Sequence, residues 1–294
     1  LSIRRQRQMC IRDRDYSAQF SDAADQQYKI YVNSDSGIVY NDALKSSGGT
    51  FELFSGDLQL TGANTYSGKT TITAGSLELM ASTGSIQSPE VNVAEGATYE
   101  IDLPAASDQT TYSGIISGSG KFKKSGLGEL TLNGENTYTG TTTISAGTLK
   151  VTGSLANTAL SVSSGAIFDV DATDEIGSIS GSGDIDLASG VTLTAGGLNN
   201  ASTTFSGVIS GDGAFSKAGS GTTTLSGANT FSGETSINEG TLLVSGSLSD
   251  STVVDVASGS NYKVGSNDTI GGLQGAGSAD LNTNTLTVLS LIHI

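Results

Sequence analysis

The chain has 294 residues, of which 40 are Gly, 2 are Pro and none is Trp. Its apolar content of 36% is too high and too regularly placed for a disordered chain, while 6% of aromatic residues is low for an ordinary large core. Beyond residue 14 there are 9 Lys against 28 Asp and Glu, which excludes nucleic acid and anionic membranes as partners. A repetitive all-β solenoid, in which each turn buries few side chains against its neighbours, fits these facts.

Both ends of the chain differ from the rest. All Arg residues and Cys10, the single Cys, lie in residues 1–14, and His293, the single His, lies in residues 289–294. Both ends resemble translated adapter sequence, so we predict non-native or disordered tails there; a native basic arm for an acidic partner is the alternative for the first. One Cys allows no intramolecular disulfide. Without an initiator Met or a signal peptide, the chain is expected to be a piece of a longer protein.

The segment after the first tail is strand-like but irregular. Short alternating runs occur at Tyr28–Val32, Gly37–Tyr40 and Thr50–Phe54, separated by Asn, Asp, Ser and Gly. We predict that these runs form the first turns of the solenoid.

One phrase of about 22 residues then occurs three times. It spans Leu58–Leu79, Leu130–Val151 and Thr223–Val244. In each copy apolar residues alternate with polar ones around Gly and Asn, which predicts strand, corner, strand, corner, strand. We expect the Leu and Ile to face inward and the Gly and Asn to form corners, the Asn adopting a left-handed backbone locally in preference to stacking between turns. The predicted structural positions are Leu60, Asn64, Tyr66, Gly68, Ile72, Gly75 and Leu77 in the first copy, Leu132, Asn136, Tyr138, Gly140, Ile144, Gly147 and Leu149 in the second, and Leu225, Asn229, Phe231, Gly233, Ile237, Gly240 and Leu242 in the third.

The sequences around the phrase repeat as well. The lead-in Tyr112–Gly126 matches Phe205–Gly219, and the closing segment Ile176–Leu187 matches Ile270–Leu281. These matches predict long repeat units at about residues 15–110, 111–203 and 204–288 within one solenoid segment, 15–288.

The combined motif, SG-x-G-x-(LF)-x-K-x-G followed by LTL-x-G-x-NTY-x-G-x-T-x-I and GTL-x-V, resembles the autotransporter-associated β-strand repeat, also called the passenger-associated transport repeat. In the second copy the motif runs from Phe122 and Lys124 to Val151, and in the third from Phe215 and Lys217 to Val244. The resemblance implies a right-handed, single-stranded parallel β-helix in the passenger region of a type V secreted protein at the Gram-negative cell surface. It also implies a C-terminal β-barrel translocator as partner, which this sequence does not include.

No motif for catalysis or metal binding is complete. A hydrolytic triad lacks a base, since His293 is the single histidine, and zinc ligands do not cluster. The segment Gly118–Phe122 approaches a phosphate loop but lacks its final Ser or Thr. The carboxylates that remain, Asp171, Asp174 and Glu175 in one group and Asp184 and Asp186 on one strand face, are interpreted as solvated surface. No cofactor is expected.

The sequence therefore favours a non-enzymatic stalk that aids outer-membrane translocation and presents an adhesive surface for glycans or proteins, in a chain that stays attached or is released. Two alternatives remain open: a β-helical polysaccharide lyase or hydrolase, and a calcium-ordered secreted repeat protein. Exposed strand edges at the ends predict self-association.

Overall fold

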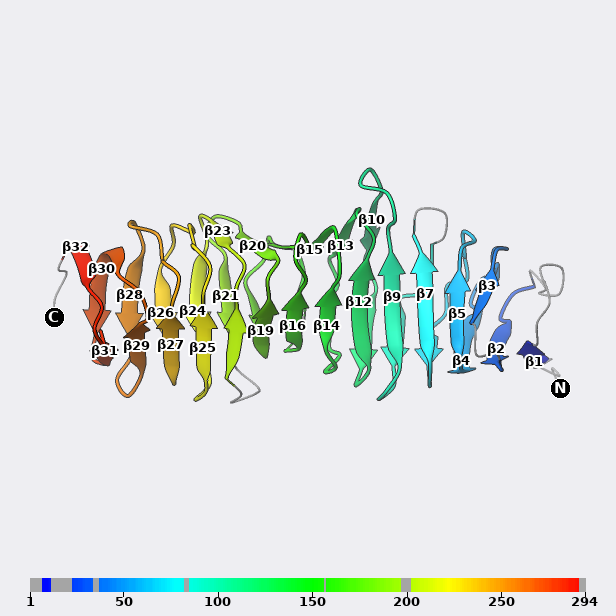
Figure 1. Cartoon of the computed structure of the whole chain (residues 1–294). Coiled ribbons are helices and arrows are strands. Elements are labelled where there is room, and N and C mark those ends of the chain that lie inside the picture. The colour runs from blue at the N-terminus through cyan, green and yellow to red at the C-terminus, as the bar shows by residue number, and fades with distance from the viewer. Residues whose placement is uncertain are drawn as a thin grey trace. The chain divides into compact units, whose positions relative to one another are not determined.

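The computed structural model describes residues 7–11, 23–33, 37–81, 85–155, 157–196 and 202–290. These residues contain strands joined by turns and no helix, and the expected all-β fold is confirmed: parallel sheets form a β-solenoid of about 13 turns. The chain divides into two compact units, Leu1–Thr142 and Thr143–Ile294, and each is described by itself (Figure 1).

The first unit contains two long parallel sheets and one further strand pair. Its first sheet has the order β1-β2-β4-β6-β8-β11, with strands Arg7–Ile11, Gln27–Val32, Thr50–Ser55, Thr70–Ile72, Glu90–Val93 and Ile115–Gly118. Its second sheet has the order β3-β5-β7-β9-β12, with strands Ile38–Tyr40, Asp57–Leu60, Ser76–Met80, Thr98–Asp102 and Lys121–Ser125. The strand pair is β10 (Gln109–Tyr112) with β13 (Glu129–Leu132), and β14 (Thr142–Ile144) begins at the last residue of the unit.

The second unit has three parallel sheets. One has the order β15-β17-β20-β23, with strands Thr148–Val151, Ile167–Val170, Asp184–Leu187 and Ile209–Gly211. The next has the order β16-β19-β22-β25-β27-β29-β31, with strands Ala159–Val162, Ser178–Gly181, Thr203–Phe205, Thr222–Leu225, Thr241–Val244, Asn261–Val264 and Ser278–Asp280. The third has the order β18-β21-β24-β26-β28-β30-β32, with strands Asp174–Ile176, Thr192–Ala195, Ala214–Lys217, Thr235–Ile237, Val253–Val256, Asp268–Gly275 and Leu286–Ser290.

The alternation in the sequence produces the inward columns of the core. In the first unit Leu58 lies opposite Leu77 and Leu60 opposite Leu79, so like residues stack from one turn to the next. Each such Leu is 5% exposed or less, and its burial contributes about 1.5–3 kcal/mol. The polar residues between them face outward, because successive side chains of a strand point to opposite faces.

Aromatic rings fill the core beside each copy of the repeated phrase. The ring centroids of Phe51 and Tyr66 are 5.9 Å apart in the first copy. Those of Phe122 and Tyr138 are 6.0 Å apart in the second, and those of Phe215 and Phe231 are 6.4 Å apart in the third. The second and third pairs join a lead-in strand to a corner, which explains why the lead-in and the phrase repeat together.

One strand lies in the first segment that the sequence separates from the solenoid, and another extends into the second. Strand β1 falls within residues 1–14 and pairs in parallel with β2, and β32 extends to Ser290 and pairs with β30. His293 lies outside the described residues. Whether these segments are native stays a prediction. Among the described residues, no helix is long and apolar enough to cross a membrane.

Candidate interaction surface and repeat corners

The repeat asparagines connect successive turns of the solenoid. The Asn64 Oδ1 accepts the backbone N–H of Leu44 at 2.8 Å, twenty residues earlier, while its Nδ2 donates to the Gly62 carbonyl at 2.7 Å. All three asparagines are nearly or fully buried. A buried backbone N–H that loses its acceptor costs about 1–3 kcal/mol, so each side chain holds the corner of the turn before it.

The other two copies repeat this arrangement. The Asn136 Oδ1 accepts the N–H of Ile116 at 2.9 Å, and the Asn229 Oδ1 accepts the N–H of Ile209 at 3.0 Å. None of the three has a positive φ, so the expected local left-handed corner is wrong. The alternative, stacking of Asn side-chain amides on one another between turns, is not observed either, because each Asn Oδ1 accepts a backbone N–H. The amide side chain completes a hydrogen bond that the strand ladder leaves open at the corner.

The repeat glycines serve two different needs. Gly75, Gly147 and Gly240 have φ values of 85°, 64° and 69°, a region that favours glycine. Gly68, Gly140 and Gly233 lack a positive φ but lie against the previous turn: a Cβ on Gly68 would be 2.5 Å from the Gly49 carbonyl oxygen. The positive φ that the sequence predicted for the corner glycines is therefore found only in the first group. In the second group glycine is required because the backbone of the previous turn leaves no room for a Cβ.

A hydroxyl pair stabilises the corner in two of the three copies. The Tyr66 and Thr70 hydroxyls are 2.8 Å apart, and those of Tyr138 and Thr142 are 2.5 Å apart. In the third copy Phe231 has no hydroxyl, and the Thr235 hydroxyl lies 3.5 Å from that of Thr252. Burial raises the pKa of Tyr66, so this hydroxyl stays protonated and can bond in the apolar interior.

Two lysines point into the core. Lys124 is 0% exposed, and its Nζ donates to the Ser125 and Gly126 carbonyls at 2.7 and 2.8 Å. Lys217 is 1% exposed, and its Nζ donates to the Ala218, Gly219 and Glu239 carbonyls at 2.7, 2.6 and 3.1 Å. Carbonyl oxygens replace the water around each ammonium group, which is what makes its burial tolerable.

Burial lowers the pKa of both lysines, to about 8 for Lys124, while nearby carboxylates raise it: Asp102 beside Lys124 and Glu239 beside Lys217. Both lysines occur in the repeat motif, but the sequence alone did not suggest their burial. A signal was present, because Lys124 follows the inward-facing Phe122 by two residues and so shares its face of the strand.

Two aspartates act in the same way as the asparagines. The Asp174 Oδ2 accepts the Leu155 N–H at 2.8 Å, and the Asp268 Oδ2 accepts the Leu248 N–H at 3.0 Å. Asp174 is 7% exposed, so its interpretation as solvated surface is wrong. Burial raises the pKa of Asp268, although backbone N–H groups that bond to it oppose the shift.

The remaining carboxylates that the sequence singled out do not form one common site. Asp171 and Asp169 both pair with Lys150, at 2.5 and 2.9 Å, which raises the pKa of that lysine. Asp184 and Asp186 are exposed and accept bonds from the Val208 N–H and the Ser210 hydroxyl. In the part of the chain that the structure describes, no group of three or more His, Cys, Asp and Glu could hold a metal ion.

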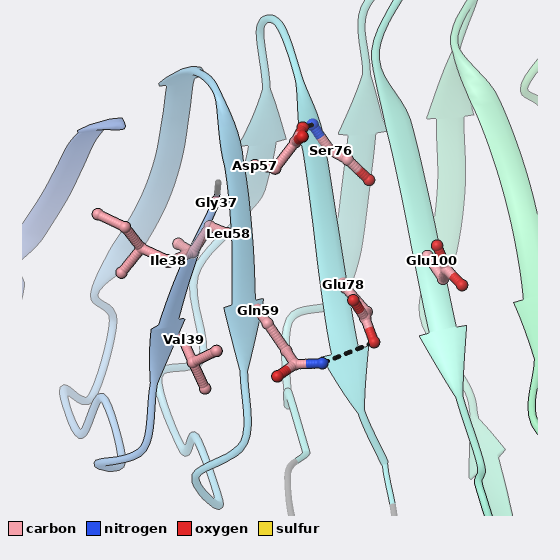
Figure 2. A pocket seen from close by; sticks show the side chains of 9 residues that line it. All are labelled: Gly37, Ile38, Val39, Asp57, Leu58, Gln59, Ser76, Glu78 and Glu100. Carbon is pink, nitrogen blue, oxygen red and sulfur yellow. Dashed lines mark hydrogen bonds between the residues drawn. The ribbon is translucent and has the colours of Figure 1, made fainter. Parts of the chain in front are cut away.

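A groove lies on the outer face of the second sheet of the first unit, over β3, β5, β7 and β9 (Figure 2). Its volume is about 340 Å³. Its central row consists of Val39, Gln59, Glu78 and Glu100, which lie opposite one another on successive strands. Lys123 on β12 continues this row beyond the groove.

The carboxylates of the groove have neighbours on the next strand. Gln59 Nε2 donates to Glu78 Oε1 at 2.7 Å, the bond drawn in Figure 2, and Glu100 pairs with Lys123 at 2.8 Å. Burial raises the pKa of Glu78 against this bond, and the facing Glu100 raises it further. The groove therefore presents three carboxylates, Asp57, Glu78 with its raised pKa and the ion-paired Glu100, with no histidine or cysteine among its lining residues.

The predicted inward positions of all three phrases are buried. Leu60, Leu132 and Leu225 are each 0% exposed, and so are the remaining Ile, Leu, Tyr and Phe positions, which are Tyr66, Ile72, Leu77, Tyr138, Ile144, Leu149, Phe231, Ile237 and Leu242. Each phrase thus supplies one strand–corner–strand–corner–strand segment of a parallel solenoid, with its polar residues outward.

Comparison with known proteins identifies these phrases. The model of the passenger-associated transport repeat family matches residues 55–79, 122–151 and 215–244. The chain thus matches the passenger-associated transport repeat at three places, which is consistent with an autotransporter passenger domain that contains such repeats. Neither the curated proteins nor the solved structures gave a significant match. The family implies a translocator as partner and a surface-exposed or secreted location, and it suggests a structural domain.

Proposed function

We propose that this chain is a non-catalytic stalk segment that helps its protein across the outer membrane and presents an adhesive surface outside the cell. The observation that carries the proposal is the repeated turn: three matched repeats in a parallel solenoid whose strands pair with the strand one turn away. Such contacts are local, so each turn can fold on the turn beside it as the chain emerges. The single Cys leaves no disulfide loop to obstruct passage.

Surface display tests the translocation part of this proposal. The complete protein is produced in a Gram-negative host, and residues 23–290 are probed with an antibody and external protease on intact cells. We expect this segment to be accessible outside the cell, and a variant without residues 111–203 to accumulate at the surface less. Equal surface accumulation of the shortened and intact proteins would contradict a translocation role.

Adhesion is tested by cell–cell and cell–surface attachment. Cells that display the intact segment should sediment or attach more than cells that display the translocator alone. β31 and β32 are the last strands of their sheets in the described chain, and Leu281 and Leu289 are exposed there. We therefore expect the purified segment to self-associate with concentration, and light scattering that shows a monomer at all concentrations would reject this part.

A second candidate function, polysaccharide cleavage, rests on the Glu78–Glu100 pair in the groove. Two neighbouring carboxylates, one acting as the acid and the other as the base or nucleophile, are what glycoside hydrolysis uses. Incubation with pectate, alginate and chondroitin, with and without calcium, would show cleavage products that disappear in Glu78→Gln. A melting temperature that shifts with millimolar calcium would instead favour a calcium-ordered repeat protein.

A further inference from the structure

Two aromatic side chains lie on the outer surface of the first sheet of the first unit. Among the described aromatic residues, all except Tyr31 on β2 and Phe54 on β4 are buried in the core. Tyr31 and Phe54 are half-buried and stacked, with ring centroids 4.4 Å apart and ring planes 7° apart. The Lys29 Nζ lies 5.9 Å from the Phe54 ring centroid.

The row that contains these rings continues with small side chains. Thr73 follows Phe54 on the next turn, as the bond from the Thr73 N–H to the Leu53 carbonyl shows, and Ala94 follows in the same way through Ile72. Thr73 is exposed. Neighbouring strands are about 4.7–4.9 Å apart, close to the distance between two stacked rings, so a flat ligand above Thr73 would lie against Phe54 and extend the stack.

A row of polar side chains runs beside this position. Glu52 on β4, Thr71 on β6 and Asn92 on β8 lie opposite one another, and all three are half-buried. These carboxylate, hydroxyl and amide groups each lie two residues before the row of Phe54, Thr73 and Ala94 along the chain, and so on the same outer face. An apolar ring face flanked by such groups suits a molecule with one apolar face and hydroxyls at its edge.

We propose that Phe54, backed by Tyr31, stacks against a sugar ring of an uncharged oligosaccharide, with Glu52, Thr71 and Asn92 as hydroxyl partners. Pyranose rings present C–H groups on their faces and hydroxyls at their edges, which matches these two rows. The acidic chain repels polyanions, so an uncharged glycan fits better than an acidic one. This inference rests on the proposed adhesive role and names its ligand class.

Saturation-transfer NMR on the purified chain tests this site, with hexasaccharides of N-acetylglucosamine, glucose and mannose as neutral probes and a galacturonate hexamer as the acidic one. We expect at least one neutral probe to bind through its ring C–H protons. Phe54→Ala and Phe54→Leu should weaken binding about tenfold, the second because it keeps apolar volume but removes the flat ring. The control Leu127→Ala changes an exposed apolar residue between β12 and β13, outside this site and outside the groove, and should bind as wild type.

Three results would overturn the inference: no neutral probe binds, only the acidic hexamer binds, or Phe54→Leu and Tyr31→Ala bind as tightly as wild type. Circular dichroism confirms that each variant is folded, and Phe54→Leu decides if Phe54→Ala is not. Surface display is measured separately, so loss of glycan binding with normal display refutes this site while the stalk function stands.

Discussion

The first and third copies of the repeat fill the same core position in opposite ways. In the first, Leu53 follows the aromatic Phe51 by two residues on β4 and is fully buried. In the third, Lys217 follows Phe215 by two residues on β24 and is just as buried. The difference shows that the position requires a long side chain, and that its polarity depends on whether carbonyl oxygens converge at its end.

The largest effect is expected where the ammonium group is removed from its carbonyls. Lys217→Ala leaves three carbonyl oxygens without their donor and opens a cavity, which should lower the free energy of unfolding by about 3–5 kcal/mol. Urea unfolding measures this loss. Lys217→Met, which fills the space as Leu53 does, should lose less, and an equal loss in both variants would show that carbonyl pairing is not the reason.

The reverse exchange should also be strongly destabilising. Leu53→Lys places an ammonium group before a longer corner. Two residues separate Leu53 from the positive-φ Gly56, whereas one residue separates Lys217 from the positive-φ Gly219. We expect about 3 kcal/mol lost in urea unfolding, because the carbonyls are not arranged for it. Wild-type stability for Leu53→Lys would mean that the corner rearranges freely to accept a charge.

The corner asparagines should matter equally in every copy. Asn64→Ala and Asn229→Ala each remove the acceptor for one buried N–H, of Leu44 and of Ile209. Each should lose about 2 kcal/mol in urea unfolding. The matched variants Asn64→Asp and Asn229→Asp keep the acceptor oxygen and should lose less. A loss confined to one copy would refute a shared role.

The hydroxyl difference between the copies should have a smaller effect. Tyr66→Phe removes the partner of the Thr70 hydroxyl and should lower the free energy of unfolding by about 1 kcal/mol. Phe231→Tyr adds a hydroxyl four residues from Thr235, where Tyr66 has its bond to Thr70. We expect Phe231→Tyr to be neutral or slightly stabilising, and a clear loss would mean that Thr252 occupies the space.

The second and third copies, which have Lys124 and Lys217 at this position, should also differ from the first, which has Leu53, in how their stability depends on pH. Because folding lowers the pKa of Lys124 to about 8, from an ordinary 10.5, the folded protein binds fewer protons than the unfolded chain between these values. The free energy of unfolding should therefore rise with pH across this window. Lys124→Met should remove this part of the rise in denaturation series at pH 8, 9 and 10, and an unchanged slope would refute it.

The fold could be predicted from the sequence, but the side-chain hydrogen bonds that stabilise it could be predicted only in part. Alternation at Leu58, Leu60, Leu77 and Leu79 fixes which side chains face inward, because a strand has period 2. The role of Asn64 could not be predicted, because its partner is a backbone N–H whose position depends on where the turn before it ends. Lys124 and Asp174 have surface-like composition, and only their register within the strand and the carbonyl or N–H groups around them make burial possible.

The stacking of the outer aromatic pair, Tyr31 and Phe54, could not be predicted from the sequence for a related reason. Tyr31 and Phe54 lie in strand-like runs whose registers differ, since the pairing of β2 and β4 shifts between Ile30 and Tyr31. Alternation alone does not say whether their rings meet. The groove row was similarly hidden, because Gln59, Glu78 and Glu100 become neighbours only once the turn lengths are known.

The hydrogen bond from a backbone N–H to the side-chain oxygen of the corner asparagine fixes the number of residues in a turn of the solenoid. In all three copies it joins residues twenty positions apart: Leu44 and Asn64, Ile116 and Asn136, and Ile209 and Asn229. A residue inserted between the two ends of such a bond would pull the acceptor out of reach, whereas one added elsewhere in the coil would leave it intact. Length variation among related coils should therefore gather outside these arcs, where side loops can grow without loosening the winding.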